Sequence, residues 1–178
     1  MDEHELHRIV EALAKQHESA QGLELLLSLA RRLVRAEAGT IYLREGNCLR
    51  CAATRNDVLT RLLGTEEFER RLKANPLTLT EPSIAGFVAV NGSTVNVPDV
   101  YAIPPDRPYR FDRRFDATTG YRTRSILAVA LHDGHGAVFG VLQLINALNE
   151  VGGVIAFNTK DEAAVAAVLA AVSRGLHS

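Results

Sequence analysis

The clearest hydrophobic pattern along the chain is a pair of apolar segments at residues 125–131 and 137–145. Both are nearly continuous in Val, Leu, Ile and Ala, and Asp133-Gly134 between them is typical of a tight hairpin turn. Strands that lack polar alternation are usually covered on both faces of their sheet. The pattern therefore predicts two antiparallel strands at the centre of a layered domain.

Helical spacing at both ends of the chain predicts the cover for one face of these strands. Residues 160–176 are rich in Ala and place Val and Leu on one side. Residues 3–17 and 23–34 carry apolar residues at the same spacing, and a break between them is expected at Gln21-Gly22. We accordingly divide the chain into an N-terminal helix at residues 1–21, interpreted as a dimerisation or linker segment, and a domain at residues 22–178.

Shorter elements are predicted between the terminal helices. Residues 39–44 and 47–54 have the pattern of a hairpin that turns at Glu45-Gly46. A polar, helical stretch follows at residues 56–74, and residues 76–80 are predicted to form a short strand. These elements add strands to the central pair.

A short helix is predicted between Ser83, which suits its N-cap, and Gly92, which suits its end. Only residues 56–120 remain to cover the second face of the sheet, and they hold short helices and a proline-rich loop. We therefore expect an α+β fold with an antiparallel sheet, long helices behind it and an irregular cap in front. Caps of this kind commonly enclose a ligand pocket.

Composition limits the possible functions. A chain of 178 residues with 47% hydrophobic content can bury one core, and a net charge of -1 gives no global attraction to nucleic acid or to an anionic membrane. No apolar run approaches the roughly 18 to 20 residues that span a bilayer, and the N-terminus does not resemble a signal peptide. Two cysteines fit a reducing compartment, so we expect a cytoplasmic protein without nucleic-acid or membrane partners.

Candidate catalytic groups are few. Cys48 and Cys51 are spaced as C-x-x-C, but residues three apart in a strand point to opposite faces, and no second cysteine pair completes a zinc site. The sequence also shows no nucleophile beside a base, no paired carboxylates and no Gly-rich phosphate loop. We predict neither catalysis nor a metal site.

The order of motifs in the second half of the chain resembles a known family. The segments SIAGFVAVNGSTVNVPDVYAIPP, FDATTGYRTRSILAVAL and GAVFGVLQLINA are similar to the GAF domains of bacterial and animal signalling proteins. The likeness covers roughly residues 22–172 and is strongest to GAF domains that precede HD-type phosphodiesterases, cyclases and histidine kinases. It implies a roughly six-stranded antiparallel sheet, backed by the terminal helices and capped by short helices over a small-molecule site.

Residues 146–162 compare with the closing signature of cyclic-nucleotide-binding GAF domains, which is Asn-Lys, a spacer, Phe and Asp-Glu. Asn146, Phe157 and Asp161-Glu162 match this signature, whereas Ala147 occupies the lysine position. In the family this lysine is thought to pair with the aspartate. Its absence makes a cyclic nucleotide one candidate ligand among several.

The same stretch also has a purely structural interpretation. Thr159 and Glu162 have the spacing of a capping box at the start of the last helix. Phe157 would anchor the connection in the core, and Gly152-Gly153 would allow its turn. We favour this interpretation for the Asp-Glu pair.

Arginines near the cap have two interpretations. The loop at residues 103–116 holds several of them, either as a basic lid over an anionic ligand or as a surface loop with locally paired charges. We favour the surface loop. Arg124 is expected to tie its strand to the cap through Asp99 rather than to contact a ligand.

Candidate ligand-binding residues come from strand parity and from the resemblance. Gln143 is the only polar residue in the second apolar segment, and its parity with Val141 and Ile145 allows it to face the cap. The resemblance implies that the amino end of the short helix beginning at Ser83 approaches the ligand and that several cap positions line the site. The full candidate set is Cys51, Ser83, Ile84, Ala85, Tyr101, Phe111, Asp112, Thr119 and Gln143.

The terminal helices and the pocket together suggest a sensory module. Both helices carry more apolar residues than one sheet face needs, which predicts a homodimer through them. We interpret the chain as a non-enzymatic GAF domain that binds a small molecule and passes its ligand state through the terminal helices to an output signalling domain, in the same chain or in trans. The alternative is a GAF dimerisation module that has lost ligand binding.

Overall fold

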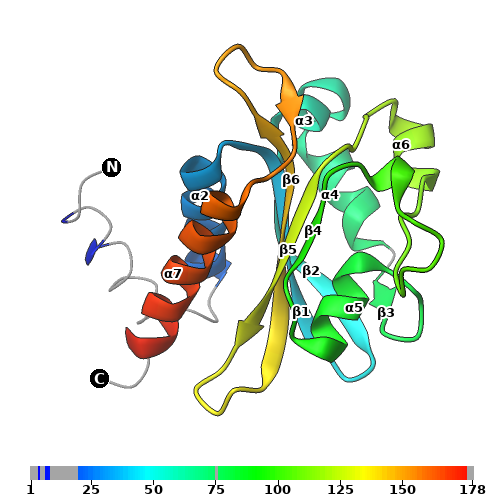
Figure 1. The fold of residues 1–178 in the computed structure, drawn as a ribbon. Coiled ribbons are helices and arrows are strands. Elements are labelled where there is room, and N and C mark those ends of the chain that lie inside the picture. The colour runs from blue at the N-terminus through cyan, green and yellow to red at the C-terminus, as the bar shows by residue number, and fades with distance from the viewer. Residues whose placement is uncertain (1–3, 5–6, 9–19, 75, 176–178) are drawn as a thin grey trace.

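A computed structural model describes residues 4, 7–8, 20–74 and 76–175 of the protein. The helix predicted at residues 3–17 therefore lies almost wholly outside the described residues. The described chain has three layers: two long helices, a central sheet, and a cap of short helices and loops on the opposite face (Figure 1). The predicted α+β architecture is confirmed.

The sheet is antiparallel, and six of its strands follow one path in the order β3-β2-β1-β6-β5-β4, with β7 pairing beside the end of β6. Its strands are β1 Ala36–Glu45, β2 Cys48–Asn56, β3 Leu77–Thr78, β4 Val95–Val97, β5 Ile126–His132, β6 Val138–Leu148 and β7 Val154–Ile155. The two apolar segments form the β5–β6 hairpin as predicted, and the Asp133 carboxylate accepts hydrogen bonds from the backbone amides of His135 and Ala137 in its turn. β1 and β2 form the second predicted hairpin.

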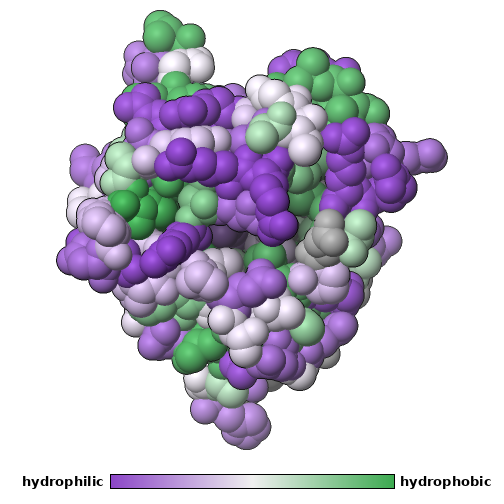
Figure 2. Space-filling view, turned by 90° about the vertical axis from the view of Figure 1, so that its right-hand side faces the viewer, coloured by the Kyte–Doolittle hydropathy of each residue, from purple (hydrophilic) through white to green (hydrophobic). Residues whose placement is uncertain are grey.

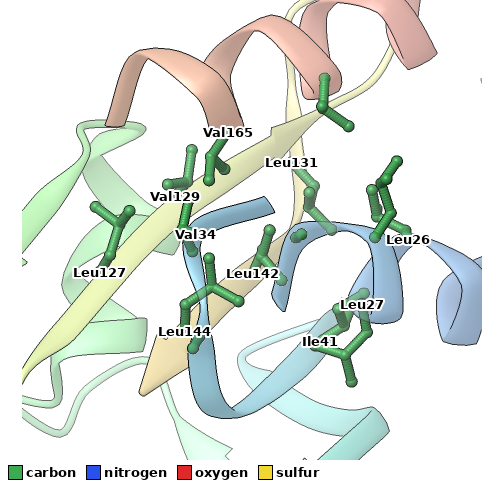
Figure 3. Packing of buried hydrophobic residues seen from close by; sticks show 14 of the residues in the cluster. Leu26, Leu27, Val34, Ile41, Leu127, Val129, Leu131, Leu142, Leu144 and Val165 are labelled. Atoms are coloured by element: carbon green, nitrogen blue, oxygen red, sulfur yellow. The ribbon is translucent and has the colours of Figure 1, made fainter. Parts of the chain in front are cut away.

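Helices α2 (Ala20–Val34) and α7 (Thr159–Gly175) cover one face of the sheet. Figure 3 shows Leu26, Leu27 and Val165 from these helices directed at strand side chains such as Leu142 and Leu144. Gln21 and Gly22 lie inside α2, so the predicted break at these residues was wrong. Gly22 is buried within the leucine-rich face, and that packing offsets the low helix propensity of glycine.

The cap contains α3 Asp57–Leu63, α4 Thr65–Lys73, α5 Ile84–Asn91, the 3-10 helix η1 Val100–Ala102, and α6 Arg114–Thr119. The helical stretch predicted at residues 56–74 is divided at Gly64, whose φ of 81° is a left-handed value that favours glycine. α5 has the predicted ends: the Ser83 hydroxyl accepts a hydrogen bond from the Gly86 amide at 2.9 Å, and Gly92 closes the helix with φ 70°.

The start of α7 differs from its prediction by one residue. The Asn158 side chain accepts from the Asp161 amide at 2.9 Å, and the Asp161 carboxylate accepts from the Asn158 amide at 2.8 Å. This is a reciprocal capping box, so the assignment of that role to Thr159 and Glu162 was wrong. Asn is one of the strongest N-cap residues, and Asp161 three positions later reaches its amide.

Candidate ligand cavity

A cavity of about 1030 Å³ lies between the sheet and the cap. Strands β1, β2 and β6 form its floor, and its walls come from the first turn of α5, from α3 and α4, and from the segment around α6. Figure 2 looks onto the cap side, where the surface is hollowed near its middle and hydrophilic side chains surround the opening. The cap is therefore not filled by its own side chains.

The floor is polar and carries no formal charge where β1 and β6 pair. Thr40 and Gln143 are register partners on these strands and both line the cavity. The hydroxyl of Thr54 on β2 lies 3.2 Å from that of Thr40, and both residues are buried. Thr54 also donates to the carbonyl of Gly39 at 3.4 Å.

Two polar groups at the floor have no protein partner. The Gln143 amide and the Tyr42 hydroxyl make no hydrogen bond within the described residues, although both side chains line the cavity. Burial raises the pKa of Tyr42 above its ordinary value, so this phenol remains a donor at neutral pH. Polar groups in such positions normally find a partner, and here a ligand or water must supply it.

The rim of the cavity is rich in arginine. Four of the five arginines that line it form ion pairs with carboxylates, and these four are Arg55, Arg70, Arg71 and Arg114. The Arg110 guanidinium makes no ion pair or hydrogen bond among the described residues. Its backbone amide donates to the carbonyl of Pro82 at 2.6 Å, which holds Arg110 beside the start of α5. Arg110 is thus the available cation at this rim.

Six of the nine candidate residues line this cavity: Ser83, Ile84, Ala85, Phe111, Asp112 and Gln143. Gln143 faces the cap, as its strand parity predicts. Asp112 is paired with Arg114 at 2.6 Å, and this pair lowers the pKa of the Asp112 carboxyl. Local pairing of this kind agrees with the surface-loop interpretation for part of the arginine-rich segment.

Cys51 lies outside the cavity lining. It is the register partner of Tyr42 and is buried, and its thiol lies 3.9 Å from the Ala53 carbonyl. Burial raises the pKa of the Cys51 thiol to about 11, which leaves it un-ionised at neutral pH and unsuited to nucleophilic chemistry. Cys48 and Cys51 are both free thiols.

Tyr101 and Thr119 also lie outside the lining, because contacts within the cap occupy them. The Tyr101 hydroxyl donates to Asp116 at 2.6 Å, and the guanidinium groups of Arg113 and Arg122 lie 4.7 Å and 3.7 Å from its ring centroid. The Thr119 hydroxyl donates to the Phe115 carbonyl at 2.8 Å, in the last turn of α6. Both side chains therefore stabilise the cavity wall from behind and do not line the cavity.

Sequence reasoning missed Thr40, Tyr42, Thr54 and Arg110 as cavity residues. Thr40 and Tyr42 alternate with Ile41 in β1, so strand parity could have identified them once the cap face of β1 was known. Arg110 had no comparable signal, because it is one of several arginines in a charged loop.

The expected tie between Arg124 and Asp99 is absent. The Arg124 guanidinium donates to the carbonyl of Val154 at 2.8 Å, and the Asp99 carboxylate accepts from the Tyr101 amide at 2.9 Å. Asp99 is therefore used as the N-cap of η1, while Arg124 fastens β7 beside the start of β5. The two side chains satisfy separate backbone groups.

The closing segment is held without the family's lysine. Ala147 is buried, and Asp161 is used in the capping box of α7. The Ser125 hydroxyl donates to the Ile155 carbonyl at 2.7 Å, and the Asn96 amide group donates to the carbonyl of the buried Phe157 at 3.0 Å. These side chain–backbone bonds fix the connection from β6 to α7.

Two other kinds of site were searched for in the described part of the chain. It contains no group of three or more His, Cys, Asp or Glu side chains that could hold a metal ion. None of its helices has the length and hydrophobicity that a bilayer crossing requires.

Comparison with known families and proteins supports one assignment. The sequence pattern of the GAF domain family matches residues 20–176. The dual 3',5'-cyclic-AMP and -GMP phosphodiesterase 11 of Drosophila melanogaster is 30% identical over 156 residues, which cover 84% of this chain and 10% of that protein. The dual 3',5'-cyclic-AMP and -GMP phosphodiesterase 11A of Takifugu rubripes is 44% identical over 63 residues, or 35% of this chain and 6% of that protein. The chain thus spans about a tenth of the length of these relatives, or less.

Solved structures share the fold. Residues 122 to 287 of a methyl-accepting chemotaxis protein superpose with a TM-score of 0.68 at 17% identity, over 95% of this chain and 94% of that one. A GAF domain/HD domain protein from Geobacter sulfurreducens gives a TM-score of 0.65 at 12% identity, over 93% and 95% of the two chains. The free methionine-R-sulfoxide reductase from Neisseria meningitidis gives 0.66 at 17% identity, over 97% and 86%. At these identities the likeness concerns the fold alone.

Proposed function

Because the chain belongs to the GAF domain family, we propose that it is a regulatory module whose cavity binds a small organic molecule. The observation that carries this proposal is the open cavity bordered by Gln143 and the start of α5, with unpaired polar groups at its floor. A cap filled by its own side chains would have argued against binding. GAF domains are regulatory modules, and the described residues that line this cavity do not include a nucleophile hydrogen-bonded to a base.

The chemistry of the cavity favours a ligand with two different ends. An uncharged edge with donors and acceptors would pair with Gln143, Thr40 and Tyr42 at the floor. An anionic group would meet Arg110 at the rim. A cyclic nucleotide has both features and remains a candidate, as do other heterocyclic or amino-acid-like anions.

Signalling through the terminal helices completes the proposal. α2 and α7 lie together on the face opposite the cap, and Leu25 on α2 is 44% exposed. We propose that this face forms a homodimer and that ligand binding in the cavity shifts the helices, which then act on an output domain in the same chain or in trans. A cytoplasmic location agrees with this role.

The test is a calorimetric screen with cyclic AMP, cyclic GMP, nucleobases, amino acids and small carboxylic acids. At least one compound is expected to bind. Gln143→Ala removes a hydrogen-bonding group and should weaken the affinity for that compound by about tenfold, equivalent to about 1.4 kcal/mol. Arg110→Gln should weaken the affinity for an anionic compound by at least as much.

Arg107→Gln is the matched control, because Arg107 is exposed on the same loop but does not line the cavity. Binding that survives both Gln143→Ala and Arg110→Gln would place the ligand elsewhere. If no compound binds and sedimentation shows a stable dimer, the chain is instead a dimerisation module that has lost its ligand.

A further inference from the structure

A polar junction lies where the end of α2, the start of β1 and the wall of the cavity meet. The Tyr121 hydroxyl donates to the Glu37 carboxylate at 2.5 Å. The Asn146 amide group donates to the Tyr121 oxygen at 3.0 Å and to Glu37 at 3.4 Å. We name Arg31, Glu37, Tyr121 and Asn146 the β1 junction.

Arg31 attaches α2 to this junction. Its guanidinium donates to the carbonyls of Ala36 at 3.3 Å and Glu37 at 2.8 Å, the first two residues of β1. It also donates to the Asp57 carboxylate at 3.2 Å, at the first residue of α3. The Arg31 side chain is only 16% exposed, so its bonds to the two backbone carbonyls are partly shielded from solvent, whereas the Asp57 side chain is 70% exposed. One side chain thus links a terminal helix to both the sheet and a cavity wall.

The backbone around the junction is held in an unusual conformation. Arg35 and Asn146 have φ angles of 54° and 58°, and they are the non-glycine residues with positive φ in the described chain. The Arg35 carbonyl accepts from the Leu148 amide at 2.9 Å, which joins the end of α2 to the end of β6. Left-handed backbone is unfavourable for a residue other than glycine, and it persists where the surroundings enforce it. The bonds between the end of α2, the start of β1 and the end of β6 therefore fix the position at which α2 joins the sheet.

Tyr121 connects the junction to the cavity. Its ring lines the cavity and packs with Leu59 and Phe68 in an apolar cluster of its own. The cap side chains around α5 belong to a different cluster, and residues of both clusters line the cavity. The same side chain therefore faces the cavity with its ring and is bonded to Glu37 through its hydroxyl.

We propose that the β1 junction couples the state of the cavity to the position of α2, with Tyr121 as its cavity-side member and Arg31 as its helix-side member. The physiological meaning of this coupling rests on the proposed ligand-binding function. The coupling itself is a property of the ligand-free chain, and it must act in both directions, because a coupling free energy is reciprocal.

Amide hydrogen exchange of Tyr121→Phe tests the coupling without any ligand. This substitution keeps the ring in its apolar cluster and removes only the hydroxyl. Amides of residues 31–38 should exchange at least threefold faster than in the unsubstituted protein, while those of β5 and the paired part of β6 stay unchanged. Tyr109→Phe is the matched control: its ring packs on Phe87 in the cap, and its hydroxyl makes no hydrogen bond within the described residues.

The reciprocal variant is Arg31→Gln. It should accelerate exchange of the Arg124 and Ser125 amides, which donate to the Asn146 side chain at 2.8 Å and 3.2 Å. Arg32→Gln is its control, since the exposed Arg32 side chain has no hydrogen bond or ion pair in the described chain.

Acceleration that stays confined to residues 114–125 in Tyr121→Phe, with residues 31–38 at their original rates, would overturn the proposal. Uniform acceleration across the sheet would also overturn it, because that result indicates general destabilisation. A ligand screen without hits would count against the proposed binding function but would leave this experiment fully interpretable.

Discussion

Asp116 shows how much of the cap depends on one buried side chain. Asp116 is 5% exposed, and its carboxylate accepts hydrogen bonds from the Tyr101 hydroxyl at 2.6 Å and from the Thr123 amide and hydroxyl, each at 2.9 Å. It thereby joins η1, α6 and the segment that leads into β5. A buried acceptor with three donors is costly to remove, because the donors lose their partner without gaining water.

We expect Asp116→Ala to lower the free energy of unfolding by about 3 kcal/mol, measured by urea denaturation. The control is Asp112→Ala, which removes an exposed carboxylate paired with Arg114 and should cost less than about 1 kcal/mol. Similar losses for the two variants would contradict the role assigned to Asp116.

At the scale of elements, the connection from β6 to α7 replaces a missing ion pair with hydrogen bonds to the backbone. Gly152 provides the turn with φ 82°, Phe157 is buried in the core, and Asn158 and Asp161 close the start of the helix. The two bonds between Asn158 and Asp161 each satisfy a backbone amide that the helix would otherwise leave unpaired. The segment is therefore fixed although the lysine of the family signature is absent.

The capping assignment predicts unequal effects for adjacent residues. Asn158→Ala should destabilise the protein by about 1 kcal/mol in chemical denaturation, because the Asp161 amide loses its acceptor. Thr159→Ala is the matched control and should change stability by less than about 0.5 kcal/mol, because Thr159 is the first residue inside the helix. A larger loss for Thr159→Ala than for Asn158→Ala would restore the capping box at Thr159.

The whole molecule is a sheet buried on both faces, with different interiors on its two sides. The interior between the sheet and the terminal helices is apolar throughout its buried cluster. The cap side divides into two apolar clusters, and the cavity with its polar floor is lined by residues of both. Ionisable groups buried on the cap side make the stability of the domain sensitive to alkaline pH.

Stability should fall above pH 9. Burial raises the pKa of the Cys51 thiol from 9.0 to about 11 and also raises that of the Tyr42 and Tyr121 phenols. The unfolded chain therefore releases these protons first, so raising the pH favours the unfolded state. Stability is unaffected by Cys51 below about pH 9 and decreases as the pH rises toward 11, with a loss of about 1 kcal/mol by pH 10.

Urea denaturation between pH 8 and pH 10.5 measures this loss. Cys51→Ala should reduce the pH dependence between pH 9 and pH 10, whereas Cys48→Ala, at a more exposed position, should leave it unchanged. Identical pH profiles for the two variants would contradict the assignment to Cys51.

Sequence patterns alone determined the features that depend on local chemistry. Apolar runs with a turn signal predicted the β5–β6 hairpin, and Ser83 and Gly92 marked the ends of α5. Helical periodicity predicted α7, and strand parity predicted that Gln143 faces the cap. Each of these depends on residues close together in the chain, so propensity and spacing suffice.

Only the tertiary structure decided which polar side chains reach the cavity and which support its wall. Arg110 has no carboxylate partner among the described residues, whereas the other four arginines that line the cavity form ion pairs. Tyr101 does not line the cavity, because the fold places its hydroxyl beside Asp116. The partners of Arg31 and Tyr121 likewise come from segments distant in the chain, at Asp57 and Glu37. Such pairings depend on sheet register and helix docking, which local patterns do not specify, so the cavity chemistry and the β1 junction emerge only when the layers assemble.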